Sequence, residues 1–220
     1  MSDERVAVII PAYNEEATVG EVVDVAKSAS RVDEVIVVDN GSSDGTTEVA
    51  EEHGARLVSH SEGGKGQAMA AGVAATDAEV LVFLDADLTG LQPDHVDRLA
   101  RPVLEGEAGM SCGLFDRGSL LNPIFLHLLP QLTGERAVRR ELFESLEPEA
   151  RSGYKVEAAL NSAVSELGME VDAFICEGMS HRTKSEKTES RISGWLKTLA
   201  MLLTAGGASI AFWVVRRRRG

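Results

Sequence analysis

Two carboxylates, Asp85 and Asp87, follow a short apolar run and are separated by a single alanine in the segment FLDADLTGLQ, residues 83–92. On an extended segment, residues i and i+2 project to the same side, so the two carboxylates would lie close together. They would repel each other unless a cation lay between them. Mg²⁺ or Mn²⁺ would meet this need and keep open positions for phosphate oxygens. The pattern predicts a metal site, with a solvated turn or a helix cap as the alternative.

Two further segments carry side chains suited to a nucleotide. Asp39 ends an apolar run and opens the loop DNGSSDGT, where its carboxylate could accept hydrogen bonds from ribose hydroxyls or a base N–H. The backbone amides of Gly41 and Ser42 in this loop suit a polar ligand. Lys65 lies between glycines at the predicted start of a helix, where a cation and free N–H groups could hold a phosphate. Each segment could also be an ordinary loop, and the lysine segment matches neither Walker A nor GxGxxG.

The elements that must position these side chains alternate along the first ninety residues. Apolar runs bounded by turn residues predict strands at 6–10, 34–38, 55–60, 79–84, 109–115 and 169–175. Helical patterns lie at 16–28, 44–54, 65–76, 92–106 and 156–168. This alternation predicts an α/β fold with a mostly parallel, Rossmann-like sheet covered by helices on both faces. Such sheets bind ligands beyond the carboxyl ends of their strands, which is where the polar segments fall.

Length, charge and cysteine content narrow the class of protein. The 220 residues suffice for one substantial α/β domain with a short remainder. A formal charge of −13, from 35 acidic and 22 basic residues, argues against a nucleic-acid partner. Cys112 and Cys176 stand in apolar stretches without CxxC or Cys/His spacing, so both are predicted to be buried thiols.

The last part of the chain carries a different signal. Residues 198–215 are uncharged, and a helix of this length spans about 27 Å, close to the apolar thickness of a bilayer. Trp195 and Trp213 lie near its ends, and four arginines follow it. A helix attached to the cytoplasmic face of the membrane is predicted over 191–220. The alternative is an amphipathic or buried helix that packs on the domain of a cytoplasmic protein. The N-terminus lacks the positive start and long apolar region of a signal peptide.

Four segments occur in the order and spacing of the family 2 glycosyltransferases of the GT-A fold, which the chain resembles over about residues 5–115. These segments are VIIPAYNEEATV, VIVVDNGSSDGT, GKGQAMAAG and VLVFLDAD. The resemblance implies a nucleotide-sugar donor, a UDP- or GDP-hexose, and residues 1–115 as the half of the domain that binds it. It places Pro11, Ala12, Tyr13 and Glu15 in the nucleotide pocket and Asp39 on the base or ribose. It also places Lys65 near the donor, Asp85 on the ribose and sugar side, and Asp87 on the metal.

Residues 116–190 are similar to the acceptor half of polyprenyl-phosphate hexose synthases and glucosyl-phosphoglycerate synthases. Within LTGERAVRRELF, Gly134 could let the chain pass close to the sugar. Arg136, Arg139 and Arg140 could meet an anionic acceptor or the diphosphate, unless the segment is an arginine-rich solvated helix. GYKVEAALN resembles the helix that carries an acidic residue, here Glu157. MSHRTKSEK resembles the segment whose histidine approaches the metal, here His181. The glutamine usual after DADL is missing, which leaves the third protein ligand of the metal open.

The resemblance implies a direct displacement that inverts the anomeric centre of the sugar. Whether this reaction needs a base depends on the acceptor. An alcohol needs a carboxylate base, with Glu135 and Glu157 as candidates. A lipid phosphate, with a second pKa of about 6, is already an anion at neutral pH. The first hypothesis is transfer of a hexose to a membrane polyprenyl phosphate of the dolichyl type. A small soluble anionic acceptor such as a phosphorylated glycerate is the second. A catalytically silent nucleotide-sugar sensor is the third.

Overall fold

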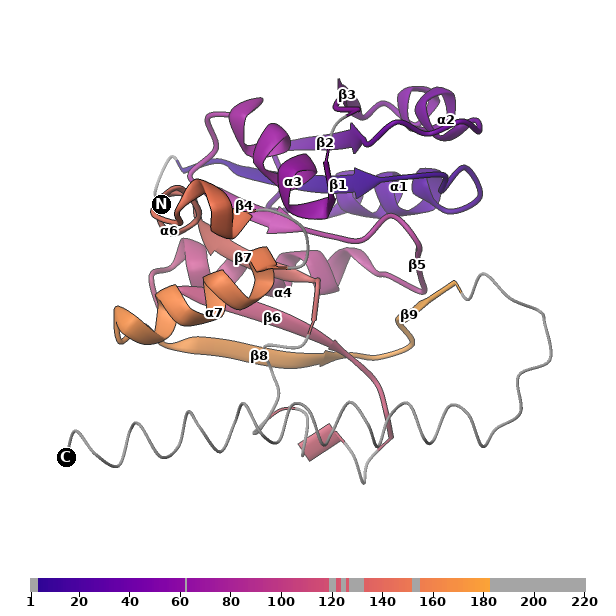
Figure 1. Ribbon diagram of the computed structural model, residues 1–220. Coiled ribbons are helices and arrows are strands. Elements are labelled where there is room, and N and C mark those ends of the chain that lie inside the picture. Colours follow the sequence, from indigo (N-terminus) through magenta and orange to yellow (C-terminus); the bar gives the residue numbers. More distant parts are fainter. Residues whose placement is uncertain are drawn as a thin grey trace, which may run out of the picture. The chain divides into compact units, whose positions relative to one another are not determined.

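One mixed sheet of seven strands forms the centre of the computed structural model of the protein, which describes residues 4–61, 63–118, 122–123, 126, 133–151 and 155–182 (Figure 1). The strands are β1 (Val6–Ala12), β2 (Glu34–Asp39), β3 (Arg56–Ser59), β4 (Val80–Phe83), β6 (Met110–Phe115), β7 (Arg136–Arg139) and β8 (Val171–Cys176). Their order is β3-β2-β1-β4-β7-β6-β8. Only β7 runs antiparallel to its neighbours among these strands, so the predicted mostly parallel α/β fold is confirmed.

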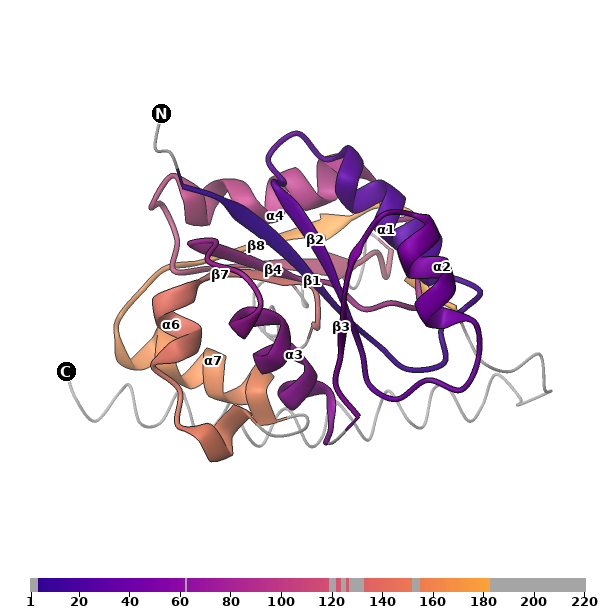
Figure 2. The same ribbon diagram turned by 90° about the horizontal axis from the view of Figure 1, so that it is seen from above.

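Helices cover both faces of this sheet, as the view from above shows (Figure 2). One face carries α1 (Val19–Ser28), α2 (Thr46–Glu52) and α4 (Pro93–Leu104). The other carries α3 (Lys65–Ala74), α6 (Arg140–Glu144) and α7 (Lys155–Glu166), with a 3-10 turn, η1 (Pro148–Arg151), before α7. Because the sheet is covered twice, its strands must be apolar on both sides, which explains their continuous apolar runs.

Strand β1 shows how the two cores share one strand. Val8 and Ile10 pack in the core beneath α1 and α4, whereas Ile9 between them packs in the core beneath α3, α6 and α7. All three side chains are fully buried. The alternation follows from the period of two residues in a strand, and it fixes the direction in which each strand delivers its last residues.

Helix α3 lies unusually close to the sheet because of a glycine. A Cβ at Gly72 would lie 2.4 Å from Cγ2 of Ile9 and 3.0 Å from Cγ2 of Val38, so no larger residue fits without movement. This contact fixes α3 against β1 and β2. Lys65 occupies the first turn of α3 and is thereby held at the carboxyl edge of the sheet.

A second, two-stranded sheet was not predicted from the sequence. It pairs β5 (Leu88–Thr89), just after the acid pair, with β9 (Ser180–His181) in antiparallel register, Leu88 opposite His181. Gly90 follows β5 with a left-handed backbone, and a Cβ there would lie 2.2 Å from the carbonyl oxygen of Gly178. The glycine thus permits the contact that brings the late histidine back to the acid pair.

The structure also tests the remaining predictions about elements. The six predicted strands and five predicted helices are confirmed with shifts of a few residues at their ends. The alternative of an arginine-rich solvated helix is wrong for residues 136–139, which form an internal strand of the sheet, whereas Arg140 begins the short helix α6. The helix predicted over 191–220 lies outside the described residues. None of the helices within the described residues has the length and apolarity needed to cross a bilayer.

The contact between Gly90 and Gly178 can be tested by comparing Gly90→Ala with Gly106→Ala. Both glycines have a positive φ, +68° and +73°, so alanine strains the backbone at both positions by about 1–2 kcal/mol. Only the alanine at position 90 would also meet another backbone, because a Cβ at position 106 has nothing within 4 Å. We expect Gly90→Ala to lose on the order of 1–3 kcal/mol more in thermal unfolding. Equal melting temperatures for the two variants would contradict the account of this contact.

Candidate active site

The loops after β1 and β2 bind each other at the carboxyl edge of the sheet. The amide of Asn14 donates to the hydroxyl of Ser42 at 2.9 Å, and the amide of Ser43 donates to the side-chain carbonyl of Asn14 at 2.8 Å. The amide of Glu15 donates to the hydroxyl of Thr46 at 2.8 Å. Asn14 adopts a positive φ of 55°, which asparagine tolerates better than most residues. These bonds hold the residues predicted to bind the nucleotide in a fixed arrangement.

Asp39 lies within this arrangement, at the end of β2 and opposite Ala12 in the strand register. Its carboxylate, in a residue only 8% exposed, accepts hydrogen bonds from the amides of Ser42 at 3.1 Å and Gly41 at 3.3 Å. Tyr13, which follows Ala12 in the chain, is 56% exposed, as a ring that stacks on a base would be. The structure therefore brings Pro11, Ala12, Tyr13, Glu15, Asp39, Gly41 and Ser42 to one edge, and their nucleotide-binding roles stay predictions.

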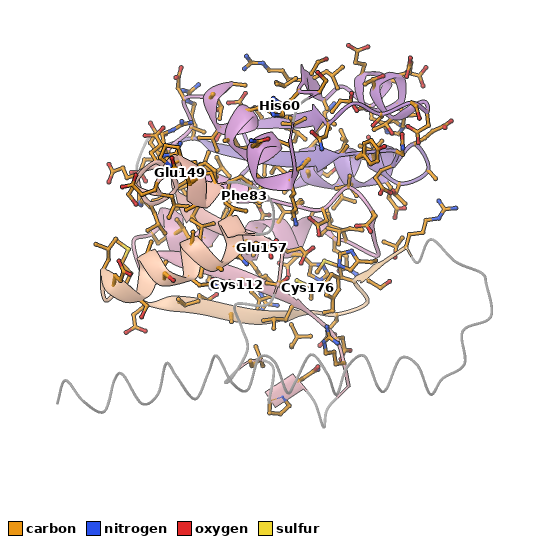
Figure 3. The ribbon with its side chains drawn as sticks, viewed as in Figure 1. His60, Phe83, Cys112, Glu149, Glu157 and Cys176 are labelled. Atoms are coloured by element: carbon orange, nitrogen blue, oxygen red, sulfur yellow. The ribbon has the colours of Figure 1, made fainter. Side chains whose placement is uncertain are left out.

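Lys65 bridges two carboxylates from distant parts of the chain. Its Nζ lies 2.6 Å from Oδ1 of Asp85, just after β4, and 3.1 Å from Oε1 of Glu157. Glu157 lies on α7 (Figure 3). The three side chains are 22–24% exposed. Burial by itself would lower the pKa of Lys65, but the charges of Asp85 and Glu157 outweigh it, so this pKa lies above its ordinary value. The lysine is thus a charged contact between the donor half and the acceptor half.

His181 reaches the acid pair through the β5–β9 pairing. Its Nδ1 lies 2.9 Å from Oδ1 of Asp87, and its ring packs on Phe115 with the ring centroids 4.5 Å apart. The amide of Arg182 donates to the carbonyl oxygen of Asp87 at 2.8 Å and so fixes the same turn. The hydrogen bond to Asp87 is the main cause that raises the pKa of His181, against the effect of burial.

Glu135 is the most deeply placed acid of the site. The residue is fully buried, and one oxygen, Oε2, is hydrogen-bonded to the hydroxyl of Thr133, whereas Oε1 is buried and has no hydrogen-bond partner among the described residues. Burial, with the charge of Asp85 as a second cause, raises the pKa of Glu135 to about 7. The Thr133 hydroxyl has one hydrogen for two acceptors, Glu135 and the carbonyl of Gly113 at 2.7 Å. A protonated Glu135 would supply the missing hydrogen, in agreement with its raised pKa.

Three of these side chains could hold a metal ion together. One atom each from Asp85, Glu135 and His181 lie within 4.8 Å of one another. Two carboxylates and an imidazole are a donor set that suits Mn²⁺ or Mg²⁺, and the partnerless oxygen of Glu135 fits a site that a cation would complete. The predicted ligands Asp85 and His181 therefore come together. Asp87, the third predicted ligand, lies in the same turn and is bonded to His181. Residues 86–87 form a turn and not the extended segment expected from the sequence.

The three predicted acceptor arginines need correction. Arg136 is fully buried and donates to the carbonyl oxygens of Thr133 and Glu157 and to the side chain of Asn161 at 3.2 Å, so its guanidinium supports the site from within the protein. Arg139 and Arg140 lie at the other end of β7, because this strand runs antiparallel to β4.

There Arg139 pairs with Glu4 at 2.7 Å, and Arg140 donates to three carbonyl oxygens at and after the end of α3. The structure does not bring either of them to the carboxyl edge. Thr133 and Asn161 are site residues that the sequence reasoning missed, since a threonine and an asparagine carry no signal outside a folded context. Cys112 and Cys176 are buried in β6 and β8, as predicted (Figure 3).

Comparison with known proteins identifies the family. The chain belongs to glycosyl transferase family 2, which matches residues 7–146. It is 33% identical to glucosyl-3-phosphoglycerate synthase of Mycobacterium tuberculosis (strain H37Rv), over 81% of this chain and 67% of that enzyme. A crystal structure of the M. tuberculosis synthase with Mn²⁺, UDP and glucosyl-3-phosphoglycerate superposes with a TM-score of 0.70, at 32% identity, over 83% of this chain and 74% of the other.

A second kind of relative shares the same family. The chain is 30% identical to the dolichyl-phosphate hexose transferase of Haloferax volcanii, over 73% of this chain and 78% of that protein. Together the comparisons confirm the GT-A fold and the prediction that the protein is a glycosyltransferase. The expectation of Mg²⁺ or Mn²⁺ is supported by the acidic cluster and by structures of the M. tuberculosis synthase that contain either ion with UDP.

Glu135 also makes stability depend on pH. The pKa of the Glu135 carboxyl group is raised on folding from 4.5 to about 7, so the native state holds this proton more tightly than the unfolded state. The resulting contribution to stability is present below pH 4.5 and is lost as the pH rises to about 7. Glu135→Gln removes this loss. In metal-free protein, the free energy of unfolding of the variant should gain on the order of 2 kcal/mol over wild type between pH 4.5 and 7.5. Denaturant titrations with chelator measure this difference, and a difference constant with pH would contradict the assignment.

Proposed function

We propose that the protein transfers glucose from UDP-glucose to the hydroxyl group of 3-phosphoglycerate, with Mn²⁺ or Mg²⁺ at the acid cluster. The observation that carries the proposal is the likeness to the M. tuberculosis synthase, in sequence and in a structure that holds Mn²⁺, UDP and the product. This choice departs from the first hypothesis of a polyprenyl phosphate acceptor. The predicted C-terminal helix lies outside the described residues, and a water-soluble acceptor does not require it.

The charge of the site supports the same choice. Asp85, Glu135 and Glu157 gather around Lys65 and His181, and Asp87 adds a fourth carboxylate. A carboxylate of this cluster can accept the proton of an attacking hydroxyl, whereas a phosphate acceptor would leave it without a role as a base. A phosphoglycerate presents its hydroxyl to the reacting carbon, whereas a polyprenyl phosphate must present its phosphate. The site therefore favours an alcohol as the nucleophile.

Different residues would have different roles in this reaction. Glu157 is the better candidate for the base, because its side chain is 24% exposed whereas Glu135 is fully buried. Lys65 donates a hydrogen bond to the Glu157 carboxylate at 3.1 Å and so holds it in place. Asp39 would hold the nucleoside, and the amides of Gly41 and Ser42, which donate to its carboxylate, fix the direction of that side chain. A divalent cation, when bound, supplies positive charge to the departing diphosphate.

The acceptor can be decided by one assay. Purified protein is incubated with UDP-glucose and Mn²⁺ and with either 3-phosphoglycerate or dolichyl phosphate in detergent, and UDP release and glucosylated product are measured. We expect product with 3-phosphoglycerate and none with the lipid. Transfer to the lipid alone would contradict the proposal and favour the reaction of the Haloferax relative. Absence of UDP release with either acceptor would favour the silent sensor.

The variant Glu157→Gln provides the matched control for this assay. Removal of a general base should reduce transfer to a hydroxyl by about 100-fold or more. A phosphate acceptor needs no base, so the same variant would then keep most of its activity. Loss of activity with retained UDP binding therefore supports a hydroxyl acceptor independently of which product is detected.

A further inference from the structure

We propose that Glu135 is a direct ligand of the divalent cation, so that the acceptor half of the domain supplies part of the metal site of the donor half. The inference rests on the proposed function for the presence of the cation. It assigns to this chain a ligand outside the acid pair and the late histidine. It also names a residue for the protein ligand that was left open because the glutamine usual after DADL is missing.

The first observation is the unused oxygen of Glu135. Hydrogen-bond acceptors buried in a folded protein almost always have a partner, yet Oε1 of this fully buried side chain has none in the part of the chain that the structure describes. Its second oxygen is held by the Thr133 hydroxyl, which in turn donates to the carbonyl of Gly113 at 2.7 Å. The carboxyl group is therefore anchored on one side, and the free oxygen has a fixed direction.

The second observation is where the carboxyl group of Glu135 lies. Glu135 offers an atom within 4.8 Å of atoms of both Asp85 and His181. The neighbouring Gly134 makes this approach feasible, because a Cβ there would lie 2.9 Å from Oδ2 of Asp85 and 2.9 Å from Nζ of Lys65. Ligands of one ion at about 2.0–2.3 Å lie within about 4.6 Å of each other, so only a small adjustment is needed.

The third observation is the balance of charge. Within the described residues, Asp85 already shares Lys65 with Glu157, and His181 is bonded to Asp87. In this part of the chain, neither Lys65 nor His181 is hydrogen-bonded to Glu135. A carboxyl group in this position is a poor choice for a purely structural role, since a neutral amide would satisfy Thr133 equally well. A divalent cation would give the partnerless oxygen a partner and would favour the ionised form of this carboxyl group over the protonated one.

The test is a calorimetric titration of Mn²⁺ into protein saturated with UDP at pH 7.5. Wild type is compared with Glu135→Gln, which keeps shape but loses the charge and one ligand oxygen, and with Glu157→Gln as the matched control. Glu157 contacts the same lysine but lies outside the three-residue cluster. We expect Glu135→Gln to weaken Mn²⁺ binding by at least about tenfold and Glu157→Gln to change it by less than about threefold. Glu135→Asp, which keeps the charge but shortens the reach, should be intermediate.

Equal losses in the two glutamine variants would overturn the proposal, because they would reduce Glu135 to a distant charge. Unchanged binding in Glu135→Gln, or no Mn²⁺ binding by wild type, would overturn it as well. Circular dichroism and melting curves in chelator exclude misfolding, since this variant should be at least as stable as wild type at that pH. If Mn²⁺ binding depends on Glu135 but no glucose reaches phosphoglycerate, the proposed function fails and the metal ligand stands.

Discussion

The mutual repulsion of carboxylates gathered at one edge of the sheet is the constraint on which the site depends. Asp85 and Glu157 both pair with Lys65, and Asp87 pairs with His181. Glu135 is fully buried, and one of its oxygens has no partner within the described ranges. Such a group is stable only because protonation, a lysine and a histidine reduce its charge in the free protein. A metal-bound sugar diphosphate could then bind by replacing these weaker compensations. The cost of assembling the acids becomes affinity for the substrate complex.

The fold provides this crowding through segments that are far apart in the chain. Parallel strands β1, β2 and β4 end at the same edge, and Gly72 lets α3 lie close enough to hold Lys65 there. The antiparallel β7 enters the sheet beside β4 and brings Glu135 beneath Asp85. The short β5–β9 pairing returns His181 to the turn of the acid pair. Donor and acceptor halves therefore complete one site, and neither half holds all of its acids.

Much of this arrangement could be predicted from the sequence, because it follows from local patterns. Apolar runs gave the strands, and the polar residues after them fell at one edge since the strands are parallel. The structure brings Asp85 and Lys65 to this edge, as the pattern led us to expect, and His181 joins them from a segment that only the resemblance to the family had indicated. The roles of all three stay predictions. Three features depend on tertiary contacts and could not be predicted. Strands β5 and β9 are too short for an alternation of apolar and polar residues to be recognised in the sequence. The direction of β7 decides that Arg139 and Arg140 point to the far end, although their sequence resembles an anion site. Only in the folded protein is Oε1 of Glu135 left without a partner in the described part of the chain, where Thr133 binds the other oxygen of the same carboxyl group.

The most direct measurement of the central claim is the position of the cation itself. A crystal of the wild-type protein with Mn²⁺ and UDP, measured at the manganese absorption edge, locates the ion without reference to the surrounding density. The account predicts a single anomalous peak at the acid cluster, with oxygens of Asp85 and Glu135 and a nitrogen of His181 at about 2.0–2.3 Å. A peak elsewhere, or one at the acid pair that leaves the Glu135 carboxyl buried and uncoordinated, would contradict it.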